Sequence, residues 1–258
     1  MNNYSDYIIA LDLDDTLLTT KKEVSKHTLD VLHRCQDNGF KIAVSSTRGY
    51  STCIKTAKEI NADYICCQAG NMIVDKYDNI IYKNPFDHQE INKFIDHFYN
   101  ITQYIYIDSD KGLYGCMDDS FSRKWNAIYC YKEQLKSINA YKICIKFDST
   151  EDMEYIISYC KDKGYVYRKM IDADFMFITP ANSDKYYALE KLMQLLNTTK
   201  DKLIVFGDDN SDMLSIKNAG HGIAMSNAKP EIIAVSTYVT DTNDNDGVAK
   251  YLENNFKI

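Results

Sequence analysis

Two clusters of acidic residues follow apolar stretches of the chain, and both could take part in chemistry. Asp12 and Asp14 come directly after one apolar run, and Asp208 and Asp212 follow a second run at residues 202–206. Short apolar runs of this kind are typical of buried strands. A carboxylate at a strand end can act as a nucleophile beside an acid, and two such clusters together suit one bound cation.

The same carboxylates also have purely structural interpretations. Aspartate is common in the turn after a strand, so Asp12 and Asp14 could cap such a turn. Asp208 and Asp212 could likewise be the cap and a first-turn acid of the following helix. The occurrence of both clusters in one chain favours the functional interpretation.

The elements that position the first cluster alternate between strand and helix patterns. Apolar runs at residues 7–11, 41–45 and 63–67 are separated by stretches with helical spacing, the first of which Ser25 can cap. The same alternation returns after Ser183. Because parallel neighbours need a crossover, which is normally a helix, the pattern predicts an α/β fold with helices on both faces of a parallel sheet.

This fold predicts where a ligand would bind. In an open parallel sheet, ligands gather beyond the carboxyl ends of the strands. Asp12, Ser46 and Asp208 each lie at the end of a predicted strand. We therefore expect these three side chains to belong to one site.

Between the two halves, residues 84–182 have the pattern of paired strands. Runs at residues 104–107 and 113–116 flank a turn that contains Gly112, which predicts a hairpin. Further strands are expected within residues 143–147, 165–167 and 175–178, with a helix capped by Ser149 or Thr150 after the first of them. The sequence thus predicts an antiparallel α+β domain inserted into the parallel one.

Composition limits the possible partners and the location of the protein. A formal net charge of -7 over 258 residues argues against nucleic acid or an anionic membrane as partner. The eight cysteines are dispersed without a C-x-x-C pair, so we expect free buried thiols. There is no run of 18 apolar residues and no leader-like start, and we expect a cytoplasmic protein that is a monomer or a weak homo-oligomer.

The motifs resemble those of the haloacid-dehalogenase (HAD) superfamily, in particular its Cof-type sugar-phosphatase branch. The first motif of the superfamily, D-x-D-x-T, is matched by Asp12, Asp14 and Thr16. The second, a strand that ends in threonine or serine, is matched by Ser46. Cof-type sequences usually read T-G-R at this point, and here Thr47 replaces the glycine.

The other two motifs lie near the end of the chain. Lys185 matches the lysine that opens a helix in the third motif. The fourth motif, usually G-D-x-x-N-D, is matched by Asp208 and Asp212, with Ser211 in place of the asparagine. The resemblance implies a Rossmann-like HAD core of residues 1–83 and 183–258. It also implies that residues 84–182 form an α/β cap domain that closes over the substrate.

The resemblance also implies roles for the acidic residues. Asp12 would be the nucleophile that forms an aspartyl-phosphate, and Asp14 the general acid and base. Mg²⁺ would be bound by the side chains of Asp12 and Asp208 and by the backbone carbonyl of Asp14. Because Asp14 follows Asp12 by two residues, we expect both to project to the same side of an extended chain.

The remaining motif residues are expected to support this chemistry. The phosphate- and substrate-binding residues implied by the resemblance are Ser46, Thr47, Lys185 and Ser211. Asp212 and Thr16 are expected to orient the metal ligands and waters without binding the metal themselves. Arg48 is expected to form a structural ion pair.

The predicted function is that of a Mg²⁺-dependent phosphatase. Its substrate would be a small phosphorylated metabolite, a sugar phosphate first of all, hydrolysed through an aspartyl-phosphate. One alternative is a phosphomutase of the same superfamily, which returns the phosphoryl group to sugar. Another is a non-catalytic sensor that binds a phosphometabolite.

Overall fold

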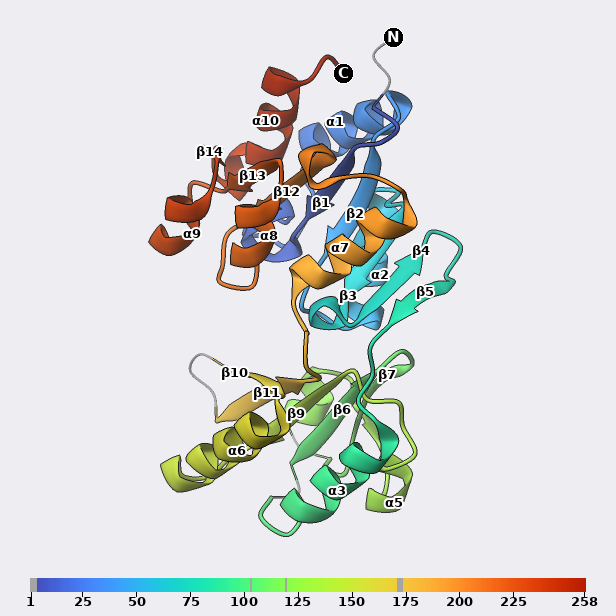
Figure 1. Ribbon diagram of the computed structural model, residues 1–258, viewed down its shortest axis with the longest axis vertical. Helices are drawn as coiled ribbons and strands as arrows, with labels where there is room; N and C mark the ends of the chain where they lie inside the picture. Colours follow the sequence, from blue (N-terminus) through green and yellow to red (C-terminus); the bar gives the residue numbers. More distant parts are fainter. Residues whose placement is uncertain (1–3, 103, 119, 171–173) are drawn as a thin grey trace. The chain divides into compact units, whose positions relative to one another are not determined.

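The computed structural model describes residues 4–102, 104–118, 120–170 and 174–258, and the chain divides into two compact units (Figure 1). The core unit comprises Met1–Arg48, Thr52–Tyr82 and Asp184–Ile258, and the inserted unit comprises Gly49–Ser51 and Lys83–Ser183. Each unit has its own sheet and its own hydrophobic core.

The core unit is built on an eight-stranded sheet with the order β14-β13-β12-β1-β2-β3-β4-β5. The strands are β1 (Ile8–Leu11), β2 (Lys41–Ser45), β3 (Tyr64–Cys67), β4 (Met72–Asp75), β5 (Ile80–Lys83), β12 (Leu203–Gly207), β13 (His221–Ala224) and β14 (Tyr238–Val239). The pairs from β14 to β3 are parallel, which confirms the predicted parallel sheet. The sequence did not predict β4, which pairs with β3 in the antiparallel direction.

Helices cover both faces of this sheet. They are α1 (Lys26–Asp37), α2 (Tyr50–Glu59), α7 (Lys185–Leu195), α8 (Met213–Asn218), α9 (Pro230–Val235) and α10 (Gly247–Asn255). The hydroxyl of Ser25 accepts a hydrogen bond from the backbone N of Thr28, 3.0 Å away, so the predicted cap of α1 is confirmed. Leu189 and Leu192 of α7 are fully buried and pack with Ala10 and Val205 of the central strands.

The inserted unit contains a six-stranded sheet with the order β10-β11-β9-β6-β7-β8. Its strands are β6 (Ile105–Ser109), β7 (Gly112–Gly115), β8 (Ile128–Tyr129), β9 (Lys142–Lys146), β10 (Val166–Lys169) and β11 (Phe175–Thr179). Neighbouring strands in this sheet are antiparallel except β7 with β8, and the predicted hairpin is the β6–β7 pair.

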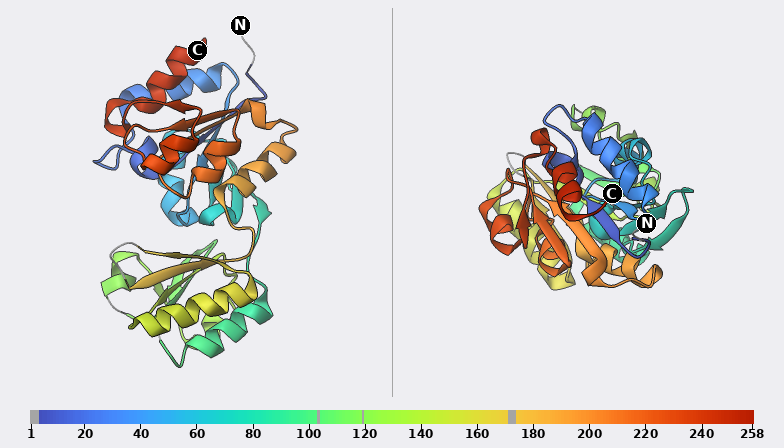
Figure 2. Two further views of the ribbon diagram at one scale, coloured as in Figure 1. Left: turned by 60° about the vertical axis from the view of Figure 1, so that its left-hand side comes forward. Right: turned by 90° about the horizontal axis from the view of Figure 1, so that it is seen from above.

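The two long helices of the inserted unit lie on the same face of its sheet (Figure 2). The helices of this unit are α3 (His88–Phe98), α4 (Ser120–Lys124), α5 (Lys132–Leu135) and α6 (Thr150–Lys163). Phe94 and Phe98 of α3 are fully buried against Ile107 and Ile143 of the sheet. The hydroxyl of Ser149 caps α6, as the sequence predicts.

Two expectations from composition can be compared with the structure. All eight cysteines are free thiols, and all except the half-buried Cys116 are buried. Among the residues that the structure describes, we find no helix with the length and apolar character that a membrane crossing requires.

Candidate active site

The carboxyl ends of three adjacent strands bring the predicted site residues to one edge of the core sheet. In the parallel register, Leu11 of β1 lies opposite both Phe206 of β12 and Val44 of β2. Asp12 follows Leu11 directly, and Asp208 follows β12 in the same direction. The two carboxylates therefore emerge side by side because the strands that carry them end in register.

Three carboxylates converge at this edge. One oxygen from each of Asp12, Asp208 and Asp212 lies within 4.8 Å of the other two. Asp12 and Asp212 are buried, and Asp208 is half-buried. The structure thus places the Asp212 carboxylate in the same cluster as the two predicted metal ligands, although the sequence assigned it an outer, orienting role. Clustered carboxylate oxygens are the ligands that a hard divalent cation prefers.

The close approach of Asp212 depends on Gly207, the last residue of β12. A Cβ atom at position 207 would lie 2.4 Å from both Cβ and Cγ of Asp212, so only glycine leaves room for this side chain. The Asp212 carboxylate also accepts weak hydrogen bonds from the backbone N of Asp208 and of Asp209, at 3.3 and 3.4 Å. The loop after β12 is therefore folded around the Asp212 side chain.

Lys185 connects two of these carboxylates from the first position of α7. Its side chain is 2% exposed, and its Nζ donates to Asp12 Oδ1 at 2.6 Å and to Asp212 Oδ1 at 2.8 Å. Asp184 caps the helix by accepting a hydrogen bond from the backbone N of Tyr186. A lysine at the start of a helix is usually solvated, whereas Lys185 is a buried cation between two acids.

Gly70 fixes the start of α7. A Cβ atom at this position would lie 2.0 Å from the backbone O of Asp184, and Gly70 has a φ of +89°. Gln68 and Ala69 before it also have positive φ values of 56°. This loop after β3 was not identified from the sequence, and it supports the position from which Lys185 reaches the acids.

The electrostatics of the cluster are dominated by burial. Burial raises the pKa of Asp12 well above its ordinary value; Lys185 opposes this rise, and the charges of Asp212 and Asp208 add to it. Burial also raises the pKa of Asp212. For Lys185, burial would lower the pKa, but the charges of Asp12 and Asp212 outweigh it, and the pKa is raised. Lys185 is therefore protonated, and it compensates part of the negative charge.

Thr16 lies beside the third carboxylate. Its hydroxyl donates to Asp208 Oδ1 at 2.8 Å. Burial, with the charges of Asp212 and Asp209, raises the pKa of Asp208 to about 6, although the Thr16 hydrogen bond opposes this rise. Repulsion between these carboxylates is what a bound cation would relieve.

The Asp14 carboxylate is held by basic side chains beside the acidic cluster. The chain leaves Asp12 through an irregular turn, Leu13–Leu17, in which Asp14 has φ/ψ of −72° and 130° and Asp15 has a φ of 54°. The Asp14 carboxylate accepts from Arg48 and, at 3.1 Å, from Lys22, and its direction relative to Asp12 stays a prediction. Burial would raise the pKa of Asp14, but these hydrogen bonds outweigh it, and the pKa is lowered.

Two outcomes follow from these contacts. The prediction that Arg48 forms an ion pair is confirmed, with Asp14 as its partner. Lys22 was not singled out from the sequence, because a single lysine in a polar segment has no spacing that identifies it.

The other predicted phosphate-binding residues lie in the loops at this edge. Ser46 is buried, and its hydroxyl accepts a hydrogen bond from the backbone N of Arg48 at 3.2 Å. Thr47 is half-buried beside it. Ser211 is buried, and its hydroxyl donates to Asp209 Oδ1 at 2.7 Å. Their roles in phosphate binding stay predictions.

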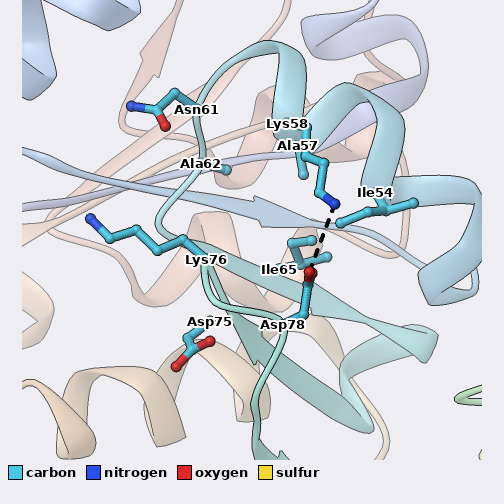
Figure 3. Close-up of a pocket in the computed structure, with 9 residues that line it drawn as sticks. All are labelled: Ile54, Ala57, Lys58, Asn61, Ala62, Ile65, Asp75, Lys76 and Asp78. Atoms are coloured by element: carbon cyan, nitrogen blue, oxygen red, sulfur yellow. Dashed lines mark ion pairs between the residues drawn. The ribbon is translucent and has the colours of Figure 1, made fainter.

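A small cavity of about 100 Å³ lies elsewhere in the core unit (Figure 3). It is lined by residues of α2, of the loop that follows it, of β3, of the end of β4 and of the turn after β4: Ile54, Ala57, Lys58, Asn61, Ala62, Ile65, Asp75, Lys76 and Asp78. Its lysines already have carboxylate partners, since Lys58 pairs with Asp78 and Lys76 with Asp63. None of these lining residues belongs to the acidic cluster, so we place the candidate site at the cluster.

Comparison with known proteins identifies the family. The haloacid dehalogenase-like hydrolase family matches residues 9–252. The chain belongs to this family. The predicted membership in the HAD superfamily is confirmed, as is the prediction of an enzyme of the hydrolase class.

Two relatives and a solved structure are similar to this chain over nearly their whole length. The putative phosphatase YxeH of Bacillus subtilis (strain 168) is 25% identical, over 94% of this chain and 95% of the relative. The 5-amino-6-(5-phospho-D-ribitylamino)uracil phosphatase YitU of the same organism is also 25% identical, over 98% of both chains. A HAD subclass IIB sugar phosphatase of known structure has the same fold, with a TM-score of 0.80, 16% identity and coverage of 96% of this chain and 98% of that chain.

Substitution of Gly207 tests whether the packing of Asp212 matters to a cation in this HAD site. Gly207→Ala is expected to displace Asp212 and to weaken the affinity of the cluster for a divalent cation by about 10- to 100-fold, as loss of a supporting contact typically does. The measurement is the Mg²⁺ concentration that raises the melting temperature half-maximally. Gly164→Ala is the matched control, because no atom of the residues that the structure describes lies within 4 Å of the added Cβ, although a positive φ of 69° opposes the substitution. Equal Mg²⁺ dependence of both variants would contradict the expectation.

Proposed function

We propose that this HAD-like hydrolase is a Mg²⁺-dependent phosphatase that hydrolyses small phosphomonoesters, sugar phosphates first among them, through an aspartyl-phosphate on Asp12. The observation that carries the proposal is the group formed by Asp12, Asp208, Asp212 and Lys185, of which all but the half-buried Asp208 are buried. It combines a nucleophile, oxygen ligands for a cation and a fixed positive charge. The names of the relatives, which are phosphatases, support the same reaction class.

In the first half of the proposed reaction, the carboxylate of Asp12 attacks the phosphorus of the substrate. The bond from phosphorus to the leaving oxygen breaks, and Asp14 gives its proton to that oxygen. The product alcohol departs, and the phosphoryl group remains on Asp12. Lys185 holds Asp12 in place by a 2.6 Å hydrogen bond, and its charge stabilises negative charge on the transferred group.

In the second half, water attacks the phosphorus of the aspartyl-phosphate. Asp14, now a carboxylate, accepts the proton of this water, and the bond between phosphorus and Asp12 breaks. Inorganic phosphate is released with Asp12 restored. The role of Asp14 requires that its carboxylate be held in a defined orientation at the edge of the site.

The donor set of the cluster fits Mg²⁺. Three carboxylates and one lysine leave excess negative charge, and oxygen donors are what this cation binds. Asp12 and Asp208 would hold it with their side chains and Asp14 with its backbone carbonyl, and Asp212 lies close enough to contribute. When bound, the cation supplies charge neutralisation for a phosphate that would otherwise be repelled by these acids.

We propose that the inserted unit determines substrate specificity. We assign the role of a cap domain to residues 84–182, which lie within the inserted unit. One relative is named for a substrate with a phosphorylated ribityl chain on a ring, so such compounds belong beside sugar phosphates in any substrate panel.

Metal removal tests the proposal directly. Purified protein with Mg²⁺ is expected to release inorganic phosphate from at least one member of a panel of phosphorylated sugars, nucleotides and coenzymes. Excess EDTA is expected to reduce this rate to background, because the clustered carboxylates then lack the charge that admits a phosphate. Added Mg²⁺ should restore it.

The same assay separates the competing functions. Stoichiometric phosphate release indicates a phosphatase, whereas a phosphomutase yields an isomeric sugar phosphate without release. A sensor turns over no member of the panel. A full rate in excess EDTA would contradict the metal assignment.

A further inference from the structure

The Arg48 guanidinium binds the Asp14 carboxylate through two hydrogen bonds. Nε donates to Oδ2 at 2.8 Å, and Nη2 donates to Oδ1 at 2.6 Å. Such a two-point contact fixes the plane of a carboxylate as well as its position, which a single point charge does not. The contact therefore restricts the rotation of the Asp14 side chain.

The backbone of Arg48 is itself fixed at both ends. Its N–H donates to the hydroxyl of Ser46 at 3.2 Å, and its carbonyl accepts from the backbone N of Gln68 at 2.8 Å. Ser46 follows β2, and Gln68 begins the loop after β3. Arg48 thus extends from an anchored segment between two strand ends, whereas Asp14 lies on an irregular turn with φ/ψ of −72° and 130°.

The solvent exposure of this ion pair argues against a purely stabilising role. The side chains of Arg48 and Asp14 are 30% and 43% exposed. Ion pairs exposed to this extent contribute about 0–1 kcal/mol to stability. The geometric order that the pair imposes is therefore its larger effect.

The contacts of the Asp14 carboxylate are unevenly divided between its two oxygens. A carboxylate offers about four acceptor positions, two on each oxygen. Arg48 occupies one position on each oxygen, and Lys22 occupies a second position on Oδ1 at 3.1 Å. Of the contacts described here, only one therefore falls on Oδ2, which leaves that oxygen a position for a substrate proton.

We propose that Arg48 is a positioning residue that orients Asp14 so that Oδ2 exchanges the proton with the leaving oxygen and with water. This inference rests on the proposed phosphatase function. Arg48 acts through Asp14 and does not itself bind the phosphoryl group. Its removal should therefore harm only those reactions that need proton transfer from Asp14.

A comparison of leaving groups tests this role. For a sugar phosphate, whose alkoxide leaves poorly, Arg48→Met is expected to lower kcat/KM by about 10- to 100-fold, the loss typical of a misplaced general acid. For acetyl phosphate, whose leaving group needs no proton, kcat/KM should change by less than about threefold. Arg48→Lys should recover little of the loss, because an ammonium cannot form the two-point contact.

A double-mutant cycle distinguishes positioning of Asp14 from a merely structural role, because only positioning makes the two losses of kcat/KM non-additive. In the Asp14→Asn background, adding Arg48→Met should cause no further loss, since the group that Arg48 orients is already absent. Arg34→Met is the matched control, because it removes another arginine–carboxylate pair, with Glu253, on the core unit. It should leave kcat/KM for both substrates unchanged.

The outcomes that would overturn the inference are specific. Equal losses for sugar phosphate and acetyl phosphate, or losses that add to those of Asp14→Asn, would show that Arg48 binds the phosphoryl group directly. Unchanged kcat/KM in both Arg48 variants would overturn it as well. These results leave the proposed function standing, whereas no turnover by the unaltered protein would overturn the function and this inference together.

Discussion

Asp12→Asn is expected to lower the rate of phosphate release by at least about 10⁴-fold, as removal of a catalytic nucleophile does in other hydrolases. The amide has the same shape as the carboxylate, so Lys185 can still donate to the remaining oxygen at this position. The variant lacks the nucleophilic carboxylate and the negative charge that Asp12 contributes to the cation site. Acid-quenched samples should show a phosphoryl adduct on the unaltered protein and none on the variant.

The same variant should separate catalysis from folding. Burial and neighbouring charges raise the pKa of Asp12, so its ionised form is unfavourable in the metal-free fold, and the neutral amide should not lower the melting temperature. The rise in melting temperature caused by Mg²⁺ should shrink. Asp15→Asn is the matched control, because Asp15 is exposed and pairs only weakly with Lys22 at 3.5 Å. A variant of Asp12 that retains more than about 1% of the rate would contradict the nucleophile assignment.

The strand-end residues of the site could be predicted from the sequence because their placement depends on local patterns. Apolar runs before Asp12, Ser46 and Asp208 identified three strands, and parallel pairing with Leu11 opposite Phe206 brings the residues that follow them to one edge. Side-chain chemistry then limited what could bind there. The fold of both units followed from the same periodicities.

The orientation of Asp14 could not be predicted in this way. It depends on a turn in which Asp15 takes a left-handed backbone conformation and on partners far along the chain, Arg48 above all. The two-residue spacing from Asp12 fixes a side only in a regular strand, and the chain enters an irregular turn at Leu13. The same limit applies to Asp212, whose approach depends on the missing Cβ of Gly207.

The antiparallel strand β4 was missed for a related reason. The chain reverses after β3 through Gln68, Ala69 and Gly70, which all have positive φ. Glutamine and alanine rarely adopt positive φ, so their presence in the sequence does not indicate such a turn. Their conformation is supported by tertiary packing, with Gly70 against the backbone of Asp184. A long-range contact of this kind leaves no signal in a local window of sequence.

The net charge of the chain does not indicate how negative charge is compensated within the site. The whole protein is acidic, and three carboxylates are concentrated at one sheet edge. The only cation that contacts two of these carboxylates among the described residues is Lys185. Removing one partner of a buried ion pair costs more than the pair contributes, because an uncompensated charge is left in a poorly solvated position. Lys185 should therefore matter to folding as well as to catalysis.

Lys185→Met is expected to lower kcat by about 10³-fold, since it removes a fixed charge aimed at the transferred phosphoryl group. In the metal-free state at pH 8, it is also expected to lower the free energy of unfolding by about 3–5 kcal/mol. Without Lys185, the pKa values of Asp12 and Asp212 rise further above those of the unfolded chain. Chemical denaturation measured between pH 5 and pH 8 tests this part.

The pH dependence of the Lys185 variant has a definite sign. A carboxyl group with a raised pKa in the folded state binds more protons there than in the unfolded state, so stability falls as pH rises through that pKa. The deficit of Lys185→Met should therefore be smaller at pH 5 than at pH 8, and Mg²⁺ should restore part of it. Lys191→Met on the same helix is the matched control, because Lys191 is exposed and its Nζ donates to the neutral side chain of Gln194. A deficit of equal size at both pH values would show that Asp12 and Asp212 do not depend on Lys185 for charge compensation.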